Sequence, residues 1–195
     1  MAAQIDEQKR ALRAEIRARR SIRTQTQREQ DAAGLTRHLA ELVTRLHART
    51  VTAYLSLPEE PPTRGFVAWA REEQIAVLVP VSREDGLLDW VRVGAEAGSP
   101  ESQDWLGMPT ASGDHLGPDA LADADLMLIP AAAIDREGMR MGWGRGYFDR
   151  TLDAAATRPP AYAVIFDDEL VETVPREAHD LPVDGVVTPT RIVTF

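Results

Sequence analysis

Apolar residues recur along the chain in two patterns, one typical of helices and the other typical of strands. Leu12 and Ile16 lie four residues apart in an otherwise polar stretch, which predicts an amphipathic helix over residues 6–23. A second helix is expected over residues 26–47, where the apolar residues at helical intervals are Leu35, Leu39, Leu42, Val43 and Leu46. The chain is therefore expected to form two helices before its first strand.

Short apolar runs bounded by Gly, Pro and polar residues follow, and they predict strands. We expect these strands over residues 51–57, 75–81, 88–93, 126–130, 161–166 and 185–188. Helices are expected over residues 64–73 and 147–156, and a helical turn from residue 118. Residues 95–118 are rich in Gly, Ser, Pro and Asp, which indicates a loop. The alternation of strands and helices favours an α/β domain with a mostly parallel sheet, and no linker divides the chain into two domains.

The composition excludes several kinds of chemistry. The chain has 195 residues and no cysteine, which excludes disulfides, thiolate catalysis and cysteine-ligated metal. No apolar run approaches the roughly 20 residues of a membrane span. The polar N-terminus lacks the apolar core of a signal peptide. We therefore expect a soluble, cytoplasmic protein with no membrane partner.

Charge is unevenly distributed along the chain. The net charge is −9, but residues 9–23 hold seven basic residues and one acidic residue, a net of +6, so the remainder carries −15. A basic helix on an acidic body suits a small polyanionic ligand and argues against nucleic acid as the main partner. Arg13, Arg17 and Arg20 share one face of the expected helix. For that spacing, a solvated basic face is the simpler interpretation.

The stretch over residues 134–152 holds the densest candidate chemistry. In Gly142-Trp143-Gly144-Arg145-Gly146 three glycines alternate with larger residues, after the apolar run 126–130 and before an expected helix. Glycine allows a ligand to approach the backbone closely, and the guanidinium of Arg145 suits phosphate. A strand, a glycine loop and a helix N-terminus together favour an anion site. The spacing matches neither GxxxxGK[ST] nor GxGxxG, and a tight structural turn remains the alternative.

Carboxylates near the ends of expected strands are candidate ligands for Mg²⁺, which binds one or two carboxylates together with phosphate oxygens and water. They are Asp149, Asp180 and Asp184. Asp149 can equally be a solvated acid in the first turn of a helix. His179 is a candidate general base or metal ligand, although a lone histidine in a polar turn is more often neither. No zinc spacing and no GxSxG nucleophile motif occurs.

Four segments of the sequence resemble the 5-formyltetrahydrofolate cyclo-ligase family, also called methenyltetrahydrofolate synthetase. The first three are Lys9-Arg10-Ala11-Leu12-Arg13, Tyr54-Leu55-Ser56 with Glu60-Pro61-Pro62-Thr63, and the C-terminal Val174-Pro175 to His179-Asp180 with Val187-Thr188-Pro189. The fourth and most specific is the central motif, followed by Pro130, Asp135, Gly138, Arg140, Met141, Gly142, Gly144, Gly146, Tyr147, Phe148, Asp149 and Arg150, with Met141 in place of a Leu and Phe148 in place of a Tyr. The match spans nearly the whole chain.

This resemblance implies a fold and a reaction. The fold is a single three-layer α/β/α domain with a mostly parallel central sheet, here over residues 1–195. The reaction converts 5-formyltetrahydrofolate and ATP to 5,10-methenyltetrahydrofolate, ADP and phosphate, with Mg²⁺ as cofactor and ATP as co-substrate. The partners are therefore small molecules, a reduced folate and ATP, and the protein is expected to be a monomer or weak dimer.

The resemblance also implies roles for individual residues. Arg145 would be catalytic, at the transferred phosphate, and Asp149 and Asp180 would hold Mg²⁺. ATP would be bound by Lys9, Arg10, Ala11, Leu12, Arg13, Arg140, Met141, Gly142, Trp143, Gly144, Arg145, Gly146, Tyr147 and Phe148. The folate would be bound by Leu55, Glu60, Trp143, Gly144, Arg145, Gly146 and Tyr147, with Glu60 accepting hydrogen bonds from the pterin ring.

Two positions depart from the family pattern. Glu169 stands where the family often has Gln, and Met108 stands where it often has Glu. Glu169 would add negative charge if it faced the nucleotide, and Met108 would remove a polar contact. A non-catalytic folate- or nucleotide-binding protein on the same scaffold is the alternative function, and a nucleic-acid binder that uses residues 9–23 is a weaker one.

Overall fold

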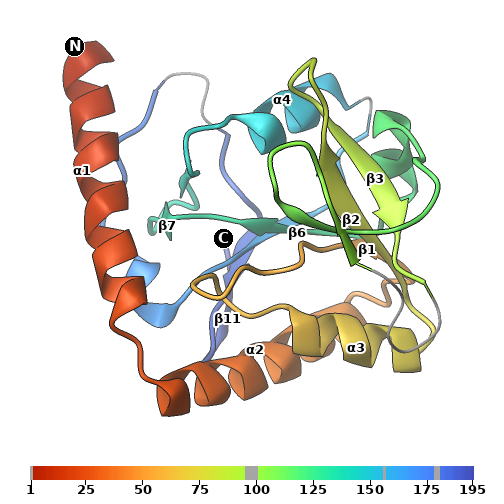
Figure 1. Ribbon diagram of the computed structural model, residues 1–195. Helices are drawn as coiled ribbons and strands as arrows, with labels where there is room; N and C mark the ends of the chain where they lie inside the picture. Colours follow the sequence, from red (N-terminus) through yellow and green to blue (C-terminus); the bar gives the residue numbers. More distant parts are fainter. Residues whose placement is uncertain (1, 95–100, 156, 178–180) are drawn as a thin grey trace.

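A seven-stranded sheet runs through the centre of the computed structural model, which describes residues 2–94, 101–155, 157–177 and 181–195 (Figure 1). The spatial order is β11-β10-β9-β6-β1-β2-β3. The strands are β1 (Thr50–Thr52), β2 (Ala76–Ser82), β3 (Leu88–Arg92), β6 (Leu126–Pro130), β9 (Ala161–Val164), β10 (Gly185–Val187) and β11 (Ile192–Thr194). All neighbours are parallel except at the two edges, where β3 and β11 are antiparallel to their partners. The mostly parallel sheet predicted from the sequence is confirmed.

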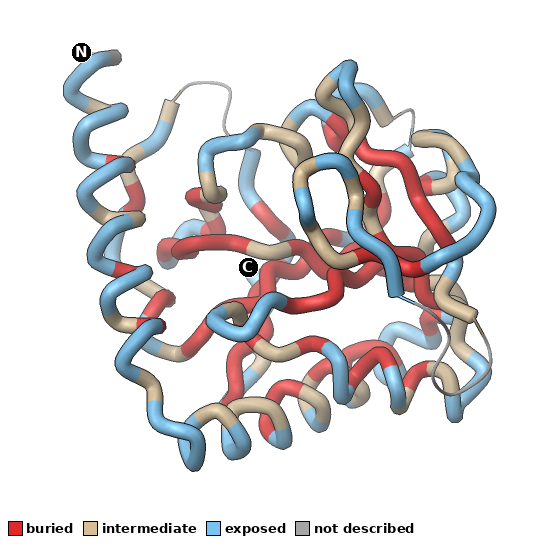
Figure 2. Tube along the Cα trace, viewed as in Figure 1, coloured by how far each residue is buried: buried red, intermediate tan, exposed pale blue. Residues whose placement is uncertain are grey.

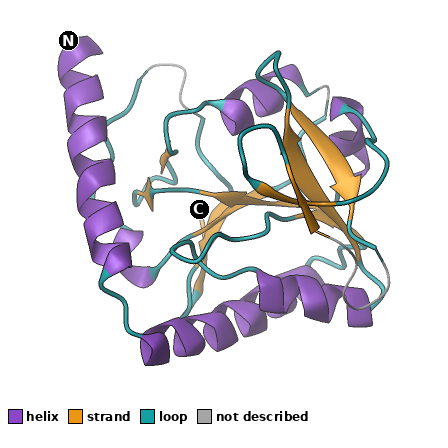
Figure 3. Ribbon diagram, viewed as in Figure 1, coloured by secondary structure: helices purple, strands orange, loops and turns teal. Residues whose placement is uncertain are grey.

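Helices cover both faces of this sheet (Figures 1 and 3). One face carries α2 (Gln25–Arg45) and α3 (Arg64–Glu72), and the other carries the short helix η1 (Pro118–Asp123) and α4 (Tyr147–Ala154). Successive residues of β6 alternate between the two faces, so that Leu128 packs on the α2 and α3 side and Met127 on the other. Burial on both faces explains why the strands are continuous apolar runs.

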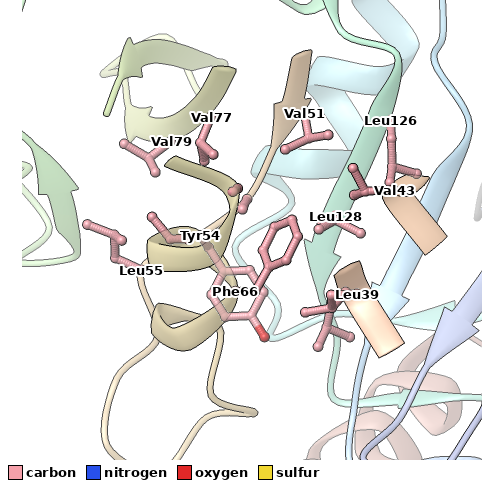
Figure 4. Packing of buried hydrophobic residues seen from close by; sticks show 14 of the residues in the cluster. Leu39, Val43, Val51, Tyr54, Leu55, Phe66, Val77, Val79, Leu126 and Leu128 are labelled. Atoms are coloured by element: carbon pink, nitrogen blue, oxygen red, sulfur yellow. The ribbon is translucent and has the colours of Figure 1, made fainter. Parts of the chain in front are cut away.

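The packing under α2 and α3 forms the larger of these two cores. Figure 4 shows Leu39 and Val43 of α2 and Phe66 of α3 against strand residues that include Val51 and Leu128. Phe66 and Leu39 are completely buried. The apolar residues at helical spacing in the second predicted helix therefore face the sheet, as expected.

The predicted helices are confirmed, with small shifts at their ends. The first is α1 (Ala2–Ser21), and the second begins after Thr24, whose side chain accepts a hydrogen bond from the backbone N–H of Gln27. The side chain of Gln27 in turn accepts from the backbone N–H of Thr24. This reciprocal capping box satisfies donors that the helix itself leaves unpaired and fixes where α2 begins.

The prediction of a loop over residues 95–118 is wrong for part of that stretch. β4 (Glu101–Gln103) pairs in antiparallel fashion with β5 (Pro109–Ala111). Asp104 shapes the connection, since its carboxylate accepts hydrogen bonds from the backbone N–H groups of Leu106 and Met108, both at 2.9 Å. It also accepts from the backbone N–H of Ser82 at 3.0 Å, which ties the hairpin to the end of β2.

The first strand is shorter than predicted. It ends at Thr52, although the backbone N–H of Ala53 still donates to the carbonyl of Leu78 in β2 at 2.9 Å. From Tyr54 onward the chain bonds to a loop. The Thr63 hydroxyl donates to the carbonyl of Tyr54, and the Thr63 N–H donates to the hydroxyl of Ser56 at 3.2 Å. These bonds fold residues 54–63 back on themselves beside the end of β1.

Four further short elements were not expected from the sequence. A two-residue ladder joins β7 (Ala133–Ile134) to β8 (Arg140–Met141), directly before the glycines, and β11 follows the strand predicted to be the last. A short helix, η2 (Asp167–Glu169), follows β9. Each is only two or three residues long, too short for a periodic pattern.

The helix α1 stands beside the sheet, next to β7, instead of lying on either face (Figure 1). Figure 2 shows that only narrow strips along it are buried. Ile16 is completely buried in a small separate cluster. The other buried members come from the segments around β7 and β8 and from a later loop, and they are Ala132, Ala133, Met141 and Val174.

We predict that Gly34→Ala destabilises the protein. A Cβ at Gly34 of α2 would overlap the carbonyl oxygen of Pro189, a backbone atom that can move only with its loop. The overlap should lower the free energy of unfolding by about 2 kcal/mol, although alanine is the better helix former. Denaturant unfolding monitored by circular dichroism measures the change.

Gly65→Ala in α3 is the matched control, because the added Cβ would meet only the hydroxyl of Thr36, which can rotate away. Its stability should equal or exceed that of the wild type. Equal stability of the two variants would contradict the close approach of α2 to the loop at Pro189.

Candidate active site

The topology leaves a crevice at the carboxyl ends of the central strands. The chain leaves β1 for β2 on one side and later returns to β6 on the other side of β1. The segments that follow β1 and β6 therefore diverge, and a ligand site is expected at the carboxyl ends of these strands. A cavity of about 880 Å³ lies there, lined by Tyr54 and Leu55 after β1, by Pro130 at the end of β6 and by Pro80 of β2.

The walls of the cavity come from several parts of the chain. The four that contribute most are one face of α1, the loop after β1, the β4–β5 hairpin and the glycine loop, which we define as residues 142–146. Residues of β2, β6, β8 (Arg140–Met141) and α4 also line it. The cavity brings together most of the residues predicted to bind ligands. These are Lys9, Arg13, Leu55, Glu60, Arg140, Met141, Gly142, Trp143, Gly144, Arg145, Gly146, Tyr147, Phe148 and Asp149.

Six of the candidate residues are not among them. One is Asp184, whose carboxylate accepts a hydrogen bond from the backbone N–H of Ala161 at 2.8 Å. Arg10, Ala11 and Leu12 lie on α1 outside the cavity wall. Arg10 and Ala11 are exposed to solvent, whereas Leu12 is half-buried and packs on the small cluster around Ile16. Asp180, together with His179, lies outside the described residues.

Three cationic side chains in the wall already contact acceptors of the protein. The Lys9 ammonium pairs with the Glu177 carboxylate at 3.0 Å. Arg13 donates from Nε to the carbonyl of Gly142 at 2.8 Å, so α1 and the glycine loop are directly bonded. Arg140, which is 5% exposed at its side chain, pairs with Asp149.

Arg145 differs from these groups. It is exposed at the cavity wall, and within the described part of the chain its guanidinium makes no hydrogen bond or ion pair. The glycines on either side adopt backbone conformations that favour glycine, with φ of +91° at Gly144 and +69° at Gly146. Gly146 also precedes the first residue of α4, so the loop places the exposed Arg145 beside a helix N-terminus.

Glu60 is the unusual acid in the wall. It is half-buried, and its Oε2 accepts a hydrogen bond from the backbone N–H of Leu57 at 2.8 Å. Burial raises the pKa of Glu60, and the Leu57 N–H and the charge of Arg20 only partly oppose that rise. Such a carboxyl group can hold or accept a proton closer to neutral pH than an exposed glutamate.

The described residues provide few side chains that could bind a metal ion. No group of three or more His, Asp or Glu side chains among them could hold one. Of the predicted metal ligands within the described residues, Asp149 and Asp184, only Asp149 lines the cavity, with its side chain 43% exposed. One carboxylate is compatible with Mg²⁺, which keeps several waters and binds phosphate oxygens, but Asp149 would have to share its charge with Arg140.

Some wall residues were not identified from the sequence as ligand contacts. Arg17 and Arg20 line the cavity beside Arg13. The simpler interpretation of this face as solvated is wrong for Arg20, which is 3% exposed. Leu106 of the β4–β5 hairpin also lines it, and the missed hairpin hid this residue. Met108, noted from the sequence only as the loss of a polar contact, lines the cavity as well.

Glu169 does not line the cavity. Its buried carboxylate accepts two hydrogen bonds from Arg20, at 2.6 and 2.8 Å, and one from the backbone N–H of Phe166 at 2.9 Å. Burial raises the pKa of Glu169, while the bonds from Arg20 lower it. The negative charge that departs from the family pattern is therefore directed at Arg20 and not into the cavity.

The described helices include none that is both long enough and apolar enough to cross a bilayer.

Comparison with known proteins identifies related sequences. A family model described as the 5-formyltetrahydrofolate cyclo-ligase family matches residues 5–189. A 5-formyltetrahydrofolate cyclo-ligase of Mycolicibacterium smegmatis is 35% identical over 188 residues, which cover 90% of each chain. The protein of the same name from Haemophilus influenzae is 25% identical over 181 residues, covering 90% of this chain and 95% of that one.

Solved structures share the fold. The NMR structure of Aquifex aeolicus 5,10-methenyltetrahydrofolate synthetase superposes with a TM-score of 0.79 at 24% identity, over 95% of this chain and 92% of that chain. The synthetase from Mycoplasma pneumoniae gives a TM-score of 0.71 at 18% identity, over 93% of this chain and 98% of that one. At these identities the superpositions show only that the fold is shared. The evidence for family membership comes from the sequence matches.

We predict that Glu60→Gln stabilises the protein increasingly as the pH rises. A carboxyl whose pKa is raised by folding contributes most stability below its unfolded pKa, near 4.5, and loses that contribution as the pH rises through the folded pKa. Glutamine has no charge to bury and can still accept from Leu57. The free energy of unfolding, measured by urea denaturation from about pH 5 to pH 8, should therefore rise relative to the wild type.

Glu59→Gln is the control for the loss of one negative charge, because Glu59 is exposed in the same loop. The stability gain of Glu60→Gln over Glu59→Gln isolates the effect of burial. A gain that shrinks with rising pH would show that the pKa of Glu60 is lowered and not raised.

Proposed function

Because the chain belongs to the 5-formyltetrahydrofolate cyclo-ligase family, and is thus a ligase, we propose that it converts 5-formyltetrahydrofolate and ATP to 5,10-methenyltetrahydrofolate, ADP and phosphate. One observation supports specific residues as the ligand-binding groups. A single cavity at the carboxyl ends of the strands is lined by Lys9, Arg13, Glu60 and Arg145, which come from segments far apart in the sequence. Together they offer cationic groups for a polyanion and a half-buried acid for a neutral heterocycle.

The reaction proceeds in two steps. The formyl oxygen attacks the γ-phosphorus of ATP, and the bond to the β,γ-bridging oxygen breaks to release ADP. The formyl carbon, now bonded to a phosphate leaving group, is attacked by N10 of the folate. N10 loses its proton, and phosphate departs with the original formyl oxygen. Both steps need alignment and charge neutralisation more than covalent help from the protein.

The cationic residues serve the first step. Lys9 and Arg13 on α1 contact the phosphates of ATP, and the backbone N–H groups of the glycine loop add donors. Arg145 contacts the transferred phosphoryl group, for which its exposed guanidinium, without an anionic partner in the described part of the chain, is suited. Charge that is already in place when the transition state forms is an effective form of catalysis.

The folate binds on the side of the loop after β1. Leu55 contacts its rings, and Glu60 accepts hydrogen bonds from the pterin N–H groups. The raised pKa of Glu60 makes ionisation costly until donors arrive, so the carboxylate is better satisfied when the substrate is bound. Trp143 and Tyr147, in the wall between the two regions, border both substrates.

Mg²⁺ would be held by Asp149 together with phosphate oxygens, and Asp180, outside the described residues, is the second predicted ligand. Bound there, the ion would neutralise phosphate charge. Arg140 keeps the Asp149 carboxylate directed at the cavity wall through their ion pair.

The remaining expectations concern the cellular setting. The proposed partners are small molecules, a reduced folate and ATP, with no nucleic acid or membrane partner. The protein is proposed to act in the cytoplasm as a single domain over residues 1–195 and as a monomer or weak dimer.

A direct assay tests the proposal. Purified protein is mixed with 5-formyltetrahydrofolate, Mg²⁺ and ATP, and the methenyl product is followed by its absorbance, with an ATP-free control. Product that requires ATP supports the proposal. Binding of both ligands by folded protein without product would instead favour a non-catalytic folate- or nucleotide-binding protein.

We predict that Arg145→Ala lowers turnover by at least about 100-fold and leaves the free energy of unfolding within about 0.5 kcal/mol of the wild type. The reason is that the guanidinium is exposed and supports no other contact among the described residues. Steady-state kinetics and urea denaturation measure the two effects.

Arg37→Ala is the matched control, since Arg37 is also exposed but lies on α2, away from the cavity. Its turnover should match the wild type. Unchanged turnover in Arg145→Ala would remove the catalytic role from this residue.

A further inference from the structure

The indole ring of Trp143, in the middle of the glycine loop, is contacted by two arginines of α1. The guanidinium carbon of Arg17 lies 5.1 Å from the ring centroid, and that of Arg20 lies 4.8 Å from it. We propose that Arg20 is a positioning residue: it holds the Trp143 ring, and through it the glycine loop, in the place that the reaction requires. The effect on turnover rests on the proposed function, but the effect on the ring does not.

The ring is held by these contacts and by apolar packing on the cluster around Ile16, and within the described part of the chain no hydrogen bond holds it. The Nε1 atom of Trp143 is buried, yet it has no hydrogen-bond partner among the residues that the structure describes. Planar guanidinium groups stack well on indole, and this attraction strengthens when the groups are shielded from water. The orientation of the ring therefore depends on where the guanidinium groups are fixed.

Arg20 is the fixed member of the pair. It is 3% exposed, whereas Arg17 is exposed. Its guanidinium donates to both carboxylate oxygens of Glu169, at 2.6 and 2.8 Å, and to the carbonyl of Ala131 at 3.1 Å. Since Ala131 directly follows β6, these bonds fix the position of the guanidinium relative to the end of a central strand.

The loop has few other means to keep its position. Its three glycines have no side chains to pack, and the side chain of Arg145 is exposed. Trp143 is its only aromatic residue and packs on the cluster around Ile16. The bond from Arg13 to the carbonyl of Gly142 fixes one end of the loop, and the guanidinium of Arg150 donates to the carbonyl of Arg145 at 2.9 Å near the other end. Between these two bonds, Trp143 and Gly144 depend on the packing of the ring. A ring that turned away would move this stretch and redirect the side chain of Arg145, and small displacements of a catalytic group can lower rates about 100-fold.

Arg20→Lys tests the proposal while keeping the positive charge that Glu169 needs. Lysine can still pair with the carboxylate, but it has no planar guanidinium group to stack on the ring. The matched control is Arg23→Lys. Arg23 also pairs with carboxylates, Asp31 and Asp168, and also stacks on an aromatic ring, but the ring is that of Phe166 at 3.8 Å, away from the cavity wall.

The decisive measurement is a double-mutant cycle with Trp143→Leu. We expect Arg20→Lys to lower kcat/KM for ATP by about tenfold or more, and Arg23→Lys to change it by less than about twofold. In the Trp143→Leu background, Arg20→Lys should add less than about a twofold loss, because the ring through which it acts is gone. Equal losses in both backgrounds, or an equal loss from Arg23→Lys, would overturn the proposal.

A second measurement needs no turnover. The fluorescence of Trp143 is obtained as the difference between each protein and its Trp143→Leu partner, and its quenching by acrylamide reports exposure of the ring. Quenching should increase in Arg20→Lys and stay unchanged in Arg23→Lys. Unchanged quenching in Arg20→Lys would refute the positioning role even if the protein is an active ligase.

The two measurements separate the failure of this inference from the failure of the proposed function. A wild-type protein without ATP-dependent product, but with the expected change in quenching, would overturn only the function. If Arg20→Lys does not fold, Glu169→Gln replaces it in the quenching experiment. Glutamine removes the charge that fixes the Arg20 guanidinium but its amide oxygen can still accept a hydrogen bond from it, so quenching of Trp143 should increase. Unchanged quenching in folded Glu169→Gln would refute the positioning role.

Discussion

The site depends on one topological constraint, the reversal of strand order beside β1. The chain adds β2 on one side of β1 and β6 on the other, so the connections that follow β1 and β6 cannot cover the same edge of the sheet. A parallel sheet with this arrangement opens a crevice at its carboxyl end. The loop with Glu60 and the segment that leads to Arg145 lie on opposite sides of that crevice for this reason alone.

The sheet leaves one side of this crevice uncovered, and α1 forms the wall on that side. A small apolar contact around Ile16 anchors α1, but most of its cationic face is turned toward the cavity. Much of this charge is balanced locally, by Glu177 for Lys9 and by Glu169 for Arg20. Burying such a pair costs free energy, and breaking one by removing a partner is strongly destabilising, by about 3–5 kcal/mol. The pairs thus specify where α1 docks more than they stabilise the fold.

Most of the elements that could be predicted from the sequence were predicted from local patterns. The helices and the apolar strands are periodic over many residues, and the glycine loop with α4 follows from a motif of adjacent residues. The β4–β5 hairpin was missed because its strands are three residues long and its turn depends on the side chain of Asp104. The end of β1 was misplaced because Thr63, from a later loop, binds the backbone at Tyr54.

Contacts between distant residues escaped prediction for a different reason. Arg20 meets Glu169 and Trp143 across more than a hundred residues of sequence, and no spacing rule links them. The shared helical face of Arg13, Arg17 and Arg20 was visible, but its periodicity is the same for a solvated face and for a cavity wall. Only the packing of α1 beside β7 distinguishes the two (Figure 1).

The central claim is that the formyl oxygen attacks the γ-phosphate of ATP within this cavity. The most direct test uses 5-formyltetrahydrofolate labelled with heavy oxygen in the formyl group, with mass analysis of the phosphate released in unlabelled water. The account predicts that each phosphate released carries the label. Unlabelled phosphate formed together with the methenyl product would contradict it, because the formyl oxygen would then have left by a route that never bonded it to phosphorus.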